Sequence, residues 1–209
     1  ENLQLIENLL KPSGLSHKII NLKKNEYDEI IQKKDENGKD ISEAMTSNMR
    51  NILKSIYLTK EEADDLVYFV EDDYIHKEEA ITEMLFTFEK ISSQIDRDIF
   101  LCPADYPYLY SKIEETKVFV GNKKHWRIVK ETLITFLTSK KMVLKHWDKL
   151  ISMGTTRHHP MEKKLHEIYE KEYCFSPIPS LAMHATNVNS AYGIPPNYDW
   201  IKNWEDNKS

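Results

Sequence analysis

Apolar and polar positions along the first hundred residues form blocks that predict helix and strand in alternation. Apolar residues that recur at helical spacing predict helices over residues 3–10, 42–59 and 77–95. Short continuous apolar runs predict strands over residues 17–22, 66–70 and 98–102, the last two of them buried. This alternation is typical of an α/β fold, in which helices cover the faces of a sheet.

The second half of the chain begins with a hairpin signal. Gly121 and Asn122 separate two runs of β-branched and aromatic residues, so residues 117–129 are expected to form two paired strands. Further patterning predicts a strand over residues 132–137 and helices over residues 139–153 and 160–173. In residues 176–209, prolines interrupt any regular pattern, while aromatic residues offer surface to bury. We expect this segment to pack over the site as an irregular tail rich in proline and aromatic residues.

Composition limits the function classes. The chain has 209 residues, 40% of them hydrophobic, which suits a single domain with a substantial core. A net charge of −5 gives no basis for bulk electrostatic binding to nucleic acid. The sequence has no apolar run of about 18 residues, so no membrane span is expected. Cys102 and Cys174 lack metal-ligand spacing and lie in apolar runs, which favours reduced thiols and a cytoplasmic protein.

The most informative stretch is the acidic triplet Glu71-Asp72-Asp73, which directly follows the apolar run at residues 66–70. Open α/β sheets bind ligands beyond the carboxyl ends of their strands. Adjacent carboxylates repel one another unless a cation neutralises them, and a hard divalent ion is the usual partner. The alternative is an acidic turn in which Asp73 caps the following helix. The triplet alone leaves both interpretations open.

Several motifs in a fixed order resemble one enzyme family. They are SNMRNI (47–52), ADDLVYFVEDDYI (63–75), PADYPYLY (103–110), HWR (125–127) and SPIPSLAMH (176–184). Together they resemble the GT-A type of nucleotide-sugar glycosyltransferases, in which a central strand ends in an acidic DXD motif and a C-terminal histidine completes the metal site. The resemblance covers most of the chain from about residue 42 onward.

The resemblance implies one domain over residues 1–209, with a GT-A-like, Rossmann-type sheet flanked by helices. It implies transfer of a sugar from a nucleotide-diphosphate donor to a hydroxyl acceptor such as a glycan, with inversion, and a Mn²⁺ or Mg²⁺ cofactor. Two features depart from the family. The motif reads Glu-Asp-Asp rather than Asp-any-Asp, and no nucleotide-binding strand precedes the first helix. We therefore expect that strand to lie upstream of Glu1.

Roles for individual residues follow from this resemblance. Asp73 and His184 are expected to bind the metal, and Asp105 to be the base that deprotonates the acceptor. The donor-binding candidates are Glu71, Asp72, Asn48 and Arg50. The acceptor-binding candidates are Tyr74, Trp126 and Trp200. Ordinary alternatives exist for each type, because aspartates form turns, helical arginines lie in solvent and aromatic residues build cores.

Two other function classes are less favoured by the sequence. A nucleotidyltransferase shares a sheet with metal-binding carboxylates, but the five glycines of this chain form no GxGxxG or Walker pattern. A non-catalytic carbohydrate-binding module accounts for the aromatic residues. It gives no reason for three carboxylates after a buried strand.

Overall fold

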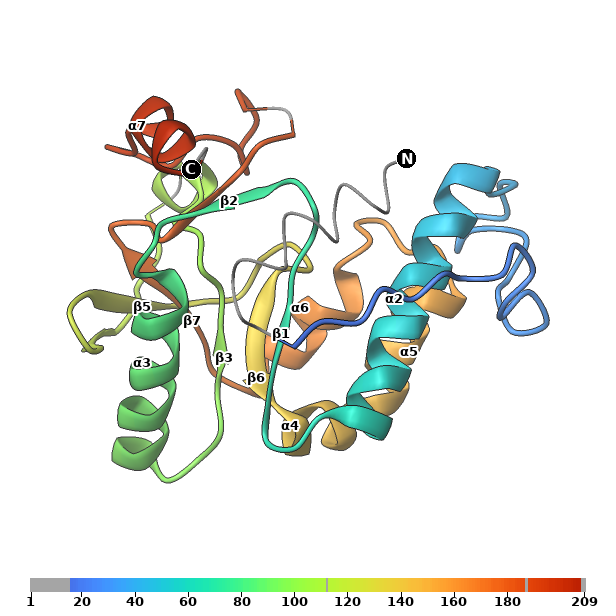
Figure 1. Ribbon diagram of the computed structural model, residues 1–209, viewed down its shortest axis with the longest axis horizontal. Helices are drawn as coiled ribbons and strands as arrows, with labels where there is room; N and C mark the ends of the chain where they lie inside the picture. Colours follow the sequence, from blue (N-terminus) through green and yellow to red (C-terminus); the bar gives the residue numbers. More distant parts are fainter. Residues whose placement is uncertain (1–15, 112, 187, 208–209) are drawn as a thin grey trace.

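The computed structural model describes residues 16–111, 113–186 and 188–207 and contains a six-stranded sheet in the order β1-β6-β3-β7-β5-β4 (Figure 1). The strands are β1 Leu66–Phe69, β3 Phe100–Leu101, β4 Val118–Val120, β5 His125–Val129, β6 Phe136–Ser139 and β7 Cys174–Ile178. β3 and β7 are parallel, and the other neighbouring pairs are antiparallel. The predicted α/β class is confirmed, and the sheet is mixed rather than uniformly parallel.

Helices surround this sheet. They are α2 Glu43–Glu62, α3 Ala80–Ile95, α4 Lys140–Lys145, α5 Trp147–Thr155, α6 Lys163–Tyr169 and α7 Trp200–Asp206, with a short 3-10 helix, η2, at Pro107–Tyr110. The predicted helix at residues 42–59 is confirmed, because the Ser42 hydroxyl accepts the Met45 N–H at 3.3 Å and caps α2. The helix predicted over residues 139–153 is divided at His146 into α4 and α5.

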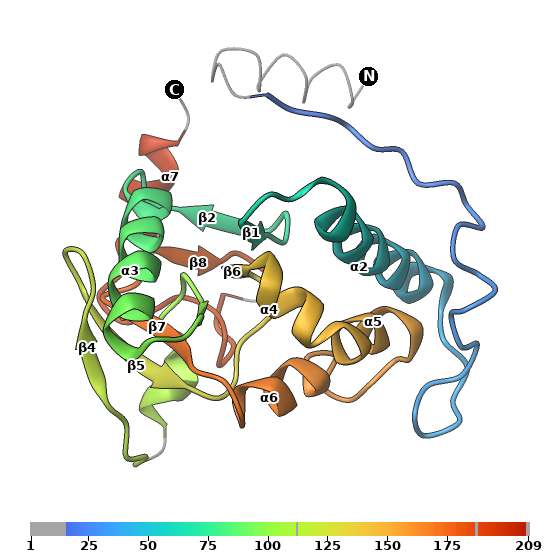
Figure 2. The same ribbon diagram turned by 90° about the horizontal axis from the view of Figure 1, so that it is seen from below.

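Side chains alternate between the two faces of the sheet and form two cores. Phe100, Phe136 and Cys174 pack with α2, α5 and α6 on one face. The next residue of each strand, Leu101, Leu137 or Phe175, packs with α3 on the other. Figure 2 shows α3 and α2 well apart, with strands between them. The period-two alternation therefore fixes which helices cover which face.

Four predictions about local structure need correction or comment. Residues 17–22 are described without a strand. β1 lies at the end of the strand order and is half-buried, so it is an edge strand rather than a buried central one. The strand predicted at residues 132–137 begins only at Phe136. The helix predicted at residues 3–10 lies outside the described residues.

The segment beyond residue 176 is not an irregular tail. β7 extends to Ile178 and lies between β3 and β5, and Pro177 is accommodated opposite Trp126. The chain then forms β8, Ala182–His184, which pairs antiparallel with β2, Tyr74–His76. This second sheet places Tyr74 opposite His184. Because β7 is part of the main sheet, this segment belongs to the core of the fold.

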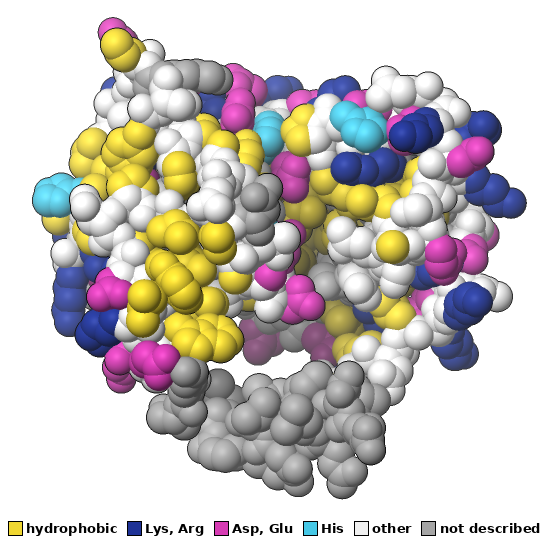
Figure 3. All heavy atoms as spheres, turned by 90° about the horizontal axis from the view of Figure 1, so that it is seen from above, with side chains coloured by type: hydrophobic (Ala, Val, Ile, Leu, Met, Phe, Trp, Pro, Cys, Tyr) yellow, Lys and Arg dark blue, Asp and Glu magenta, His cyan; other side chains and the backbone are white. Residues whose placement is uncertain are grey.

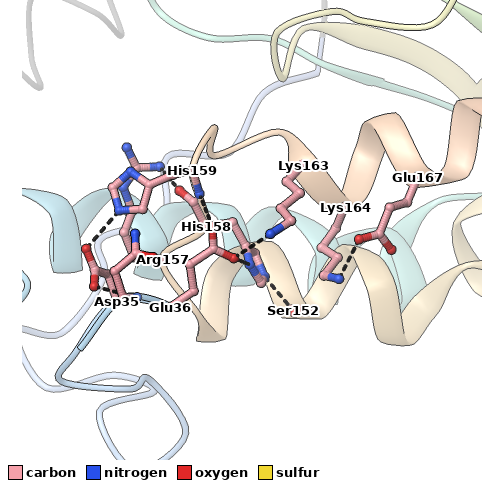
Figure 4. Close-up of polar contacts among 10 residues, drawn as sticks. Asp35, Glu36, Ser152, Arg157, His158, His159, Lys163, Lys164 and Glu167 are labelled. Atoms are coloured by element: carbon pink, nitrogen blue, oxygen red, sulfur yellow. Dashed lines mark hydrogen bonds and ion pairs between the residues drawn. The ribbon is translucent and has the colours of Figure 1, made fainter. Parts of the chain in front are cut away.

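The loop before α2 is attached to the α5–α6 connection by charged groups (Figure 4). The Glu36 carboxylate accepts Lys163 Nζ at 2.8 Å and the His159 backbone N–H at 2.9 Å. Its Oε2 also lies 3.2 Å from His158 Nδ1, while Asp35 Oδ2 lies 2.8 Å from His159 Nε2. These interactions connect two segments that are far apart in the sequence.

Two further sequence predictions concern the environment of the chain. Within the described ranges, no helix is long and apolar enough to cross a membrane. Cys102 and Cys174 are both free thiols, and both are buried.

Candidate functional site

A cleft of about 980 Å³ lies between α2 and β1. Apolar side chains such as Ile52, Val67 and Phe136 line part of it, and the acidic triplet Glu71-Asp72-Asp73 lies at the end of β1. Figure 3 shows this face of the molecule hollowed, with hydrophobic side chains in the hollow and acidic side chains near its edge. The cleft therefore combines apolar surface with a concentration of negative charge.

Polar side chains of α2 line the opposite wall. Asn48, Asn51 and Ser55 lie on one exposed stripe of the helix and border the cleft. Asn48 was among the predicted donor-binding residues, and the structure places it at the cleft. Asn51 and Ser55 were missed, although their spacing of three and four residues was a readable signal.

Glu71 is held by a buried threonine. The Glu71 backbone N–H donates to Thr135 Oγ1 at 3.0 Å, and that hydroxyl donates to Glu71 Oε2 at 3.3 Å. Burial, with a smaller contribution from the negative charge of Asp73, raises the pKa of Glu71 to about 7. Asp72 is exposed at the same end of the cleft. The structure thus places both predicted residues in the cleft wall.

Asp73 and His184 are brought together by the pairing of β2 and β8. His184 Nε2 lies 2.9 Å from Asp73 Oδ2, and the Ala185 backbone N–H donates to the Asp73 carbonyl at 2.7 Å. Asp73 Oδ1 and His184 Nδ1 are buried and have no hydrogen-bond partner in the described part of the chain. Two predicted metal ligands therefore share one site, each with an unsatisfied polar atom.

A cation at this position would be only partly coordinated by protein. The described residues contain no cluster of three or more His, Cys, Asp or Glu side chains able to hold a metal. Mg²⁺ and related ions are commonly held by one or two carboxylates, with substrate phosphates and waters completing the shell. Asp73 and His184 carry oxygen and nitrogen donors of the kind that suits Mn²⁺. His184 Nε2 faces Asp73 and Nδ1 lies on the other side of the ring, so one ion would contact both side chains only after their mutual contact opened.

Asp105 lies in a different environment from the one predicted for a base. Its carboxylate forms an ion pair with Arg127 and accepts the Tyr110 hydroxyl at 2.5 Å, and both charged side chains are largely buried. Burial raises the pKa of Asp105, while Tyr110 and Arg127 act in the opposite direction. Asp105 is not among the residues that line the cleft. These contacts favour a structural ion pair, and the role of Asp105 as the base stays a prediction.

Arg50 also has structural partners. Its Nη2 lies 2.6 Å from Asp28 Oδ1, its Nη1 lies 3.0 Å from Glu43 Oε1, and the guanidinium is buried. The hydrogen bonds that Arg50 donates to Glu43 and Asp28 raise the pKa of Arg50. Because the guanidinium faces these carboxylates and does not line the cleft, the predicted contact with donor phosphates needs correction.

The predicted acceptor-binding aromatic residues are in three different places. Trp126 is fully buried, and its Nε1 donates to Glu83 Oε1 at 3.2 Å, so it cannot stack on a substrate. Tyr74 is buried too, with its hydroxyl bonded to that of Tyr106 and its ring centroid 5.3 Å from that of His184. Trp200 is 42% exposed on α7 and does not line the cleft.

Comparison with known proteins adds no family assignment. No protein-family model matches the chain, and no curated protein matches it in sequence.

Proposed function

We propose that this protein is a metal-dependent glycosyltransferase that transfers a sugar from a nucleotide-diphosphate sugar to a hydroxyl acceptor, such as a glycan. The observation that carries the proposal is the Asp73–His184 pair. These two residues were selected from sequence motifs in separate parts of the chain, and their side chains lie 2.9 Å apart. Their unsatisfied buried atoms support binding of a cation at this position.

The cleft supports a donor of this size and chemistry. Ligand pockets commonly measure about 300–1,000 Å³, and this cleft is at the upper end of that range. Asn48, Asn51 and Ser55 offer amide and hydroxyl groups to a ribose or a base, while Ile52 and Val67 offer apolar surface. Since the wall around Glu71-Asp72-Asp73 is negative, a diphosphate needs a cation beside it.

The proposed reaction forms a bond from the acceptor oxygen to the anomeric carbon. The bond from that carbon to the diphosphate oxygen breaks, and the nucleoside diphosphate leaves with the bonding electrons. The acceptor proton passes to a base. A divalent cation, when bound, stabilises the negative charge that develops on the leaving diphosphate. Asp73, with His184 beside it, would hold that cation at the end of the cleft.

The two alternative functions are less well supported. A nucleotidyltransferase also needs a metal beside carboxylates, but nothing observed in the cleft favours it over sugar transfer. A non-catalytic carbohydrate-binding module leaves the buried atoms of Asp73 and His184 without explanation.

The proposal is tested by donor turnover without an acceptor, since water can replace the acceptor hydroxyl slowly. The protein is incubated with Mn²⁺ and UDP-glucose, UDP-galactose, UDP-N-acetylglucosamine or GDP-mannose, and released nucleoside diphosphate is measured. We expect release from at least one donor, with loss of release on chelation by EDTA and in Asp73→Asn. The matched control is Asp64→Asn, an exposed aspartate before β1 that does not line the cleft. Absence of release and of binding for every donor, with and without metal, would contradict the proposal.

A further inference from the structure

Helix α7 is attached to β2 through polar groups. The Tyr198 hydroxyl donates to the Ile75 carbonyl at 3.1 Å, and Asn203 Nδ2 donates to that hydroxyl at 2.7 Å. After the helix, Asn207 Nδ2 donates to the His76 carbonyl at 3.1 Å. Asn203 is the buried residue of α7. The helix is therefore held in place without burying its large apolar side chains.

Those apolar side chains lie at the surface. Trp200, Ile201 and Trp204 are 42%, 59% and 48% exposed. Contiguous exposed apolar residues commonly mark an interaction site on a protein surface, whereas single ones do not. Trp204 also borders a pocket of about 240 Å³, which it forms with Asn207 and strand β2. Trp200, on the same helix, does not line this pocket.

The chemistry of the pocket favours a small uncharged ligand. Its lining residues are Tyr74, Ile75, His76, Trp204 and Asn207, none of them Asp, Glu, Lys or Arg. Burial lowers the pKa of His76, so its imidazole is neutral at pH 7. An indole ring beside an amide suits a sugar, because the C–H face of a pyranose packs on the ring while the Asn207 Oδ1 can accept from a hydroxyl. The Asn207 Nδ2 donates to the His76 and Asn203 carbonyls.

The pocket is next to the proposed donor cleft. β2 follows directly after Asp73, and its residues line the pocket. The Tyr68 hydroxyl, from a residue that lines the cleft, is hydrogen-bonded to His76 Nε2 at 2.5 Å, and His76 lines the pocket. The Tyr68–His76 contact is thus part of the wall between the two cavities.

We propose that the pocket between β2 and α7 binds one uncharged pyranose ring, stacked on Trp204, as the acceptor sugar. The role as acceptor rests on the proposed transferase function, whereas binding of the sugar ring does not. The pocket is smaller than the cleft and suits a single ring at the end of a longer glycan. A phosphorylated or anionic ligand is not favoured, because the lining supplies no cationic side chain.

Saturation-transfer NMR tests this proposal with methyl α-glucoside, methyl β-galactoside and methyl α-mannoside as probes. We expect transfer to at least one glycoside with wild-type protein and an affinity at least about tenfold weaker in Trp204→Ala. Trp200→Ala is the matched control, since it removes a similarly exposed indole from the same helix. Loss of binding in Trp204→Ala with retention in Trp200→Ala supports the subsite.

The same samples separate failure of the subsite from failure of the donor site. The increase in melting temperature with Mn²⁺ and UDP or GDP reports on the cleft and is expected to be unchanged in Trp204→Ala. No transfer to any glycoside, or equal loss in both tryptophan variants, overturns the subsite whatever the nucleotide result. Equal loss accompanied by a concentration-dependent dimer in wild-type protein would instead assign the exposed face of α7 to self-association. Glycoside binding through Trp204 without any nucleotide effect retains the subsite and contradicts the transferase.

Discussion

His184 Nε2 lies 2.9 Å from Asp73 Oδ2, where the two-stranded β2–β8 sheet meets the end of the cleft. The other polar atom of each side chain is buried without a hydrogen-bond partner in the described ranges. An unsatisfied buried polar group costs about 1–3 kcal/mol, so this arrangement lowers stability unless a ligand satisfies it. Each side chain therefore retains one polar atom that a ligand would satisfy.

Glu71 is expected to destabilise the fold at alkaline pH. Its folded pKa of about 7 exceeds the ordinary value of 4.5, so the folded state holds an extra proton between these pH values and loses stability as pH rises through them. Glu71→Gln should raise the free energy of unfolding by on the order of 2 kcal/mol at pH 8 and change it little near pH 4. Urea unfolding at both pH values measures this. An equal effect at the two pH values would rule out ionisation as the cause.

Asp105 is expected to be structural. Asp105→Asn leaves Arg127 without its buried partner, and we expect a loss of about 3–5 kcal/mol in the free energy of unfolding. The double variant Asp105→Asn/Arg127→Met should lose less than the sum of the two single changes. Denaturant unfolding of the three variants provides the comparison. If Asp105 were instead the base, Asp105→Asn would keep near-normal stability while sugar transfer slowed by roughly 10²–10⁴-fold.

Glu36 has the opposite pH dependence from Glu71. Hydrogen bonds from Lys163, from the His159 backbone and from His158 lower the pKa of Glu36 to about 2, below the ordinary value of 4.5. Its contribution to stability is therefore complete above pH 4.5 and is lost as pH falls toward 2. Glu36→Gln should lower the melting temperature at pH 7, and the difference should shrink between pH 4.5 and 3. Exposed Glu29→Gln is the control, and a difference that is constant with pH would argue against the ion pairs.

His184 is expected to set the preference between metals. Nitrogen ligands favour Mn²⁺ over Mg²⁺, so His184→Ala should weaken Mn²⁺ binding in the presence of GDP or UDP more than it weakens Mg²⁺ binding. Isothermal titration gives, for each metal, the ratio of the dissociation constant of His184→Ala to that of wild-type protein. His125→Ala, which changes an exposed histidine on β5, should leave both unchanged. Equal weakening for both metals would assign His184 to orientation of Asp73 instead.

Local sequence patterns predicted which helices and strands form better than they predicted which strands pair with one another. The helices at residues 42–59 and 77–95 were readable because a long apolar stripe repeats at helical spacing. The three-residue strands β2 and β8 are too short to carry a period, so their pairing was not foreseen. The edge position of β1 depends on strand order, which a run of apolar residues does not specify.

The candidate site was predicted only in part, because the sequence shows local patterns but not which distant residues meet. The acidic triplet was visible as a break in an apolar run, and the structure places all three residues at the cleft. Asp105 pairs with Arg127 from a distant segment, and Arg50 pairs with Glu43 two helical turns away. The sequence alone does not show that these charged groups meet. Trp126 occupies the inward position of a half-buried hairpin strand, and strand alternation was the available signal for its burial.

We propose that Asp73 holds a divalent cation together with a nucleoside diphosphate. Electron paramagnetic resonance measures free Mn²⁺ directly as protein is added in the presence of GDP or UDP. We expect wild-type protein and the control Asp64→Asn to bind Mn²⁺ when the nucleotide is present, and Asp73→Asn to bind it at least about tenfold more weakly while remaining folded. Unchanged nucleotide-dependent Mn²⁺ binding by folded Asp73→Asn would contradict the account.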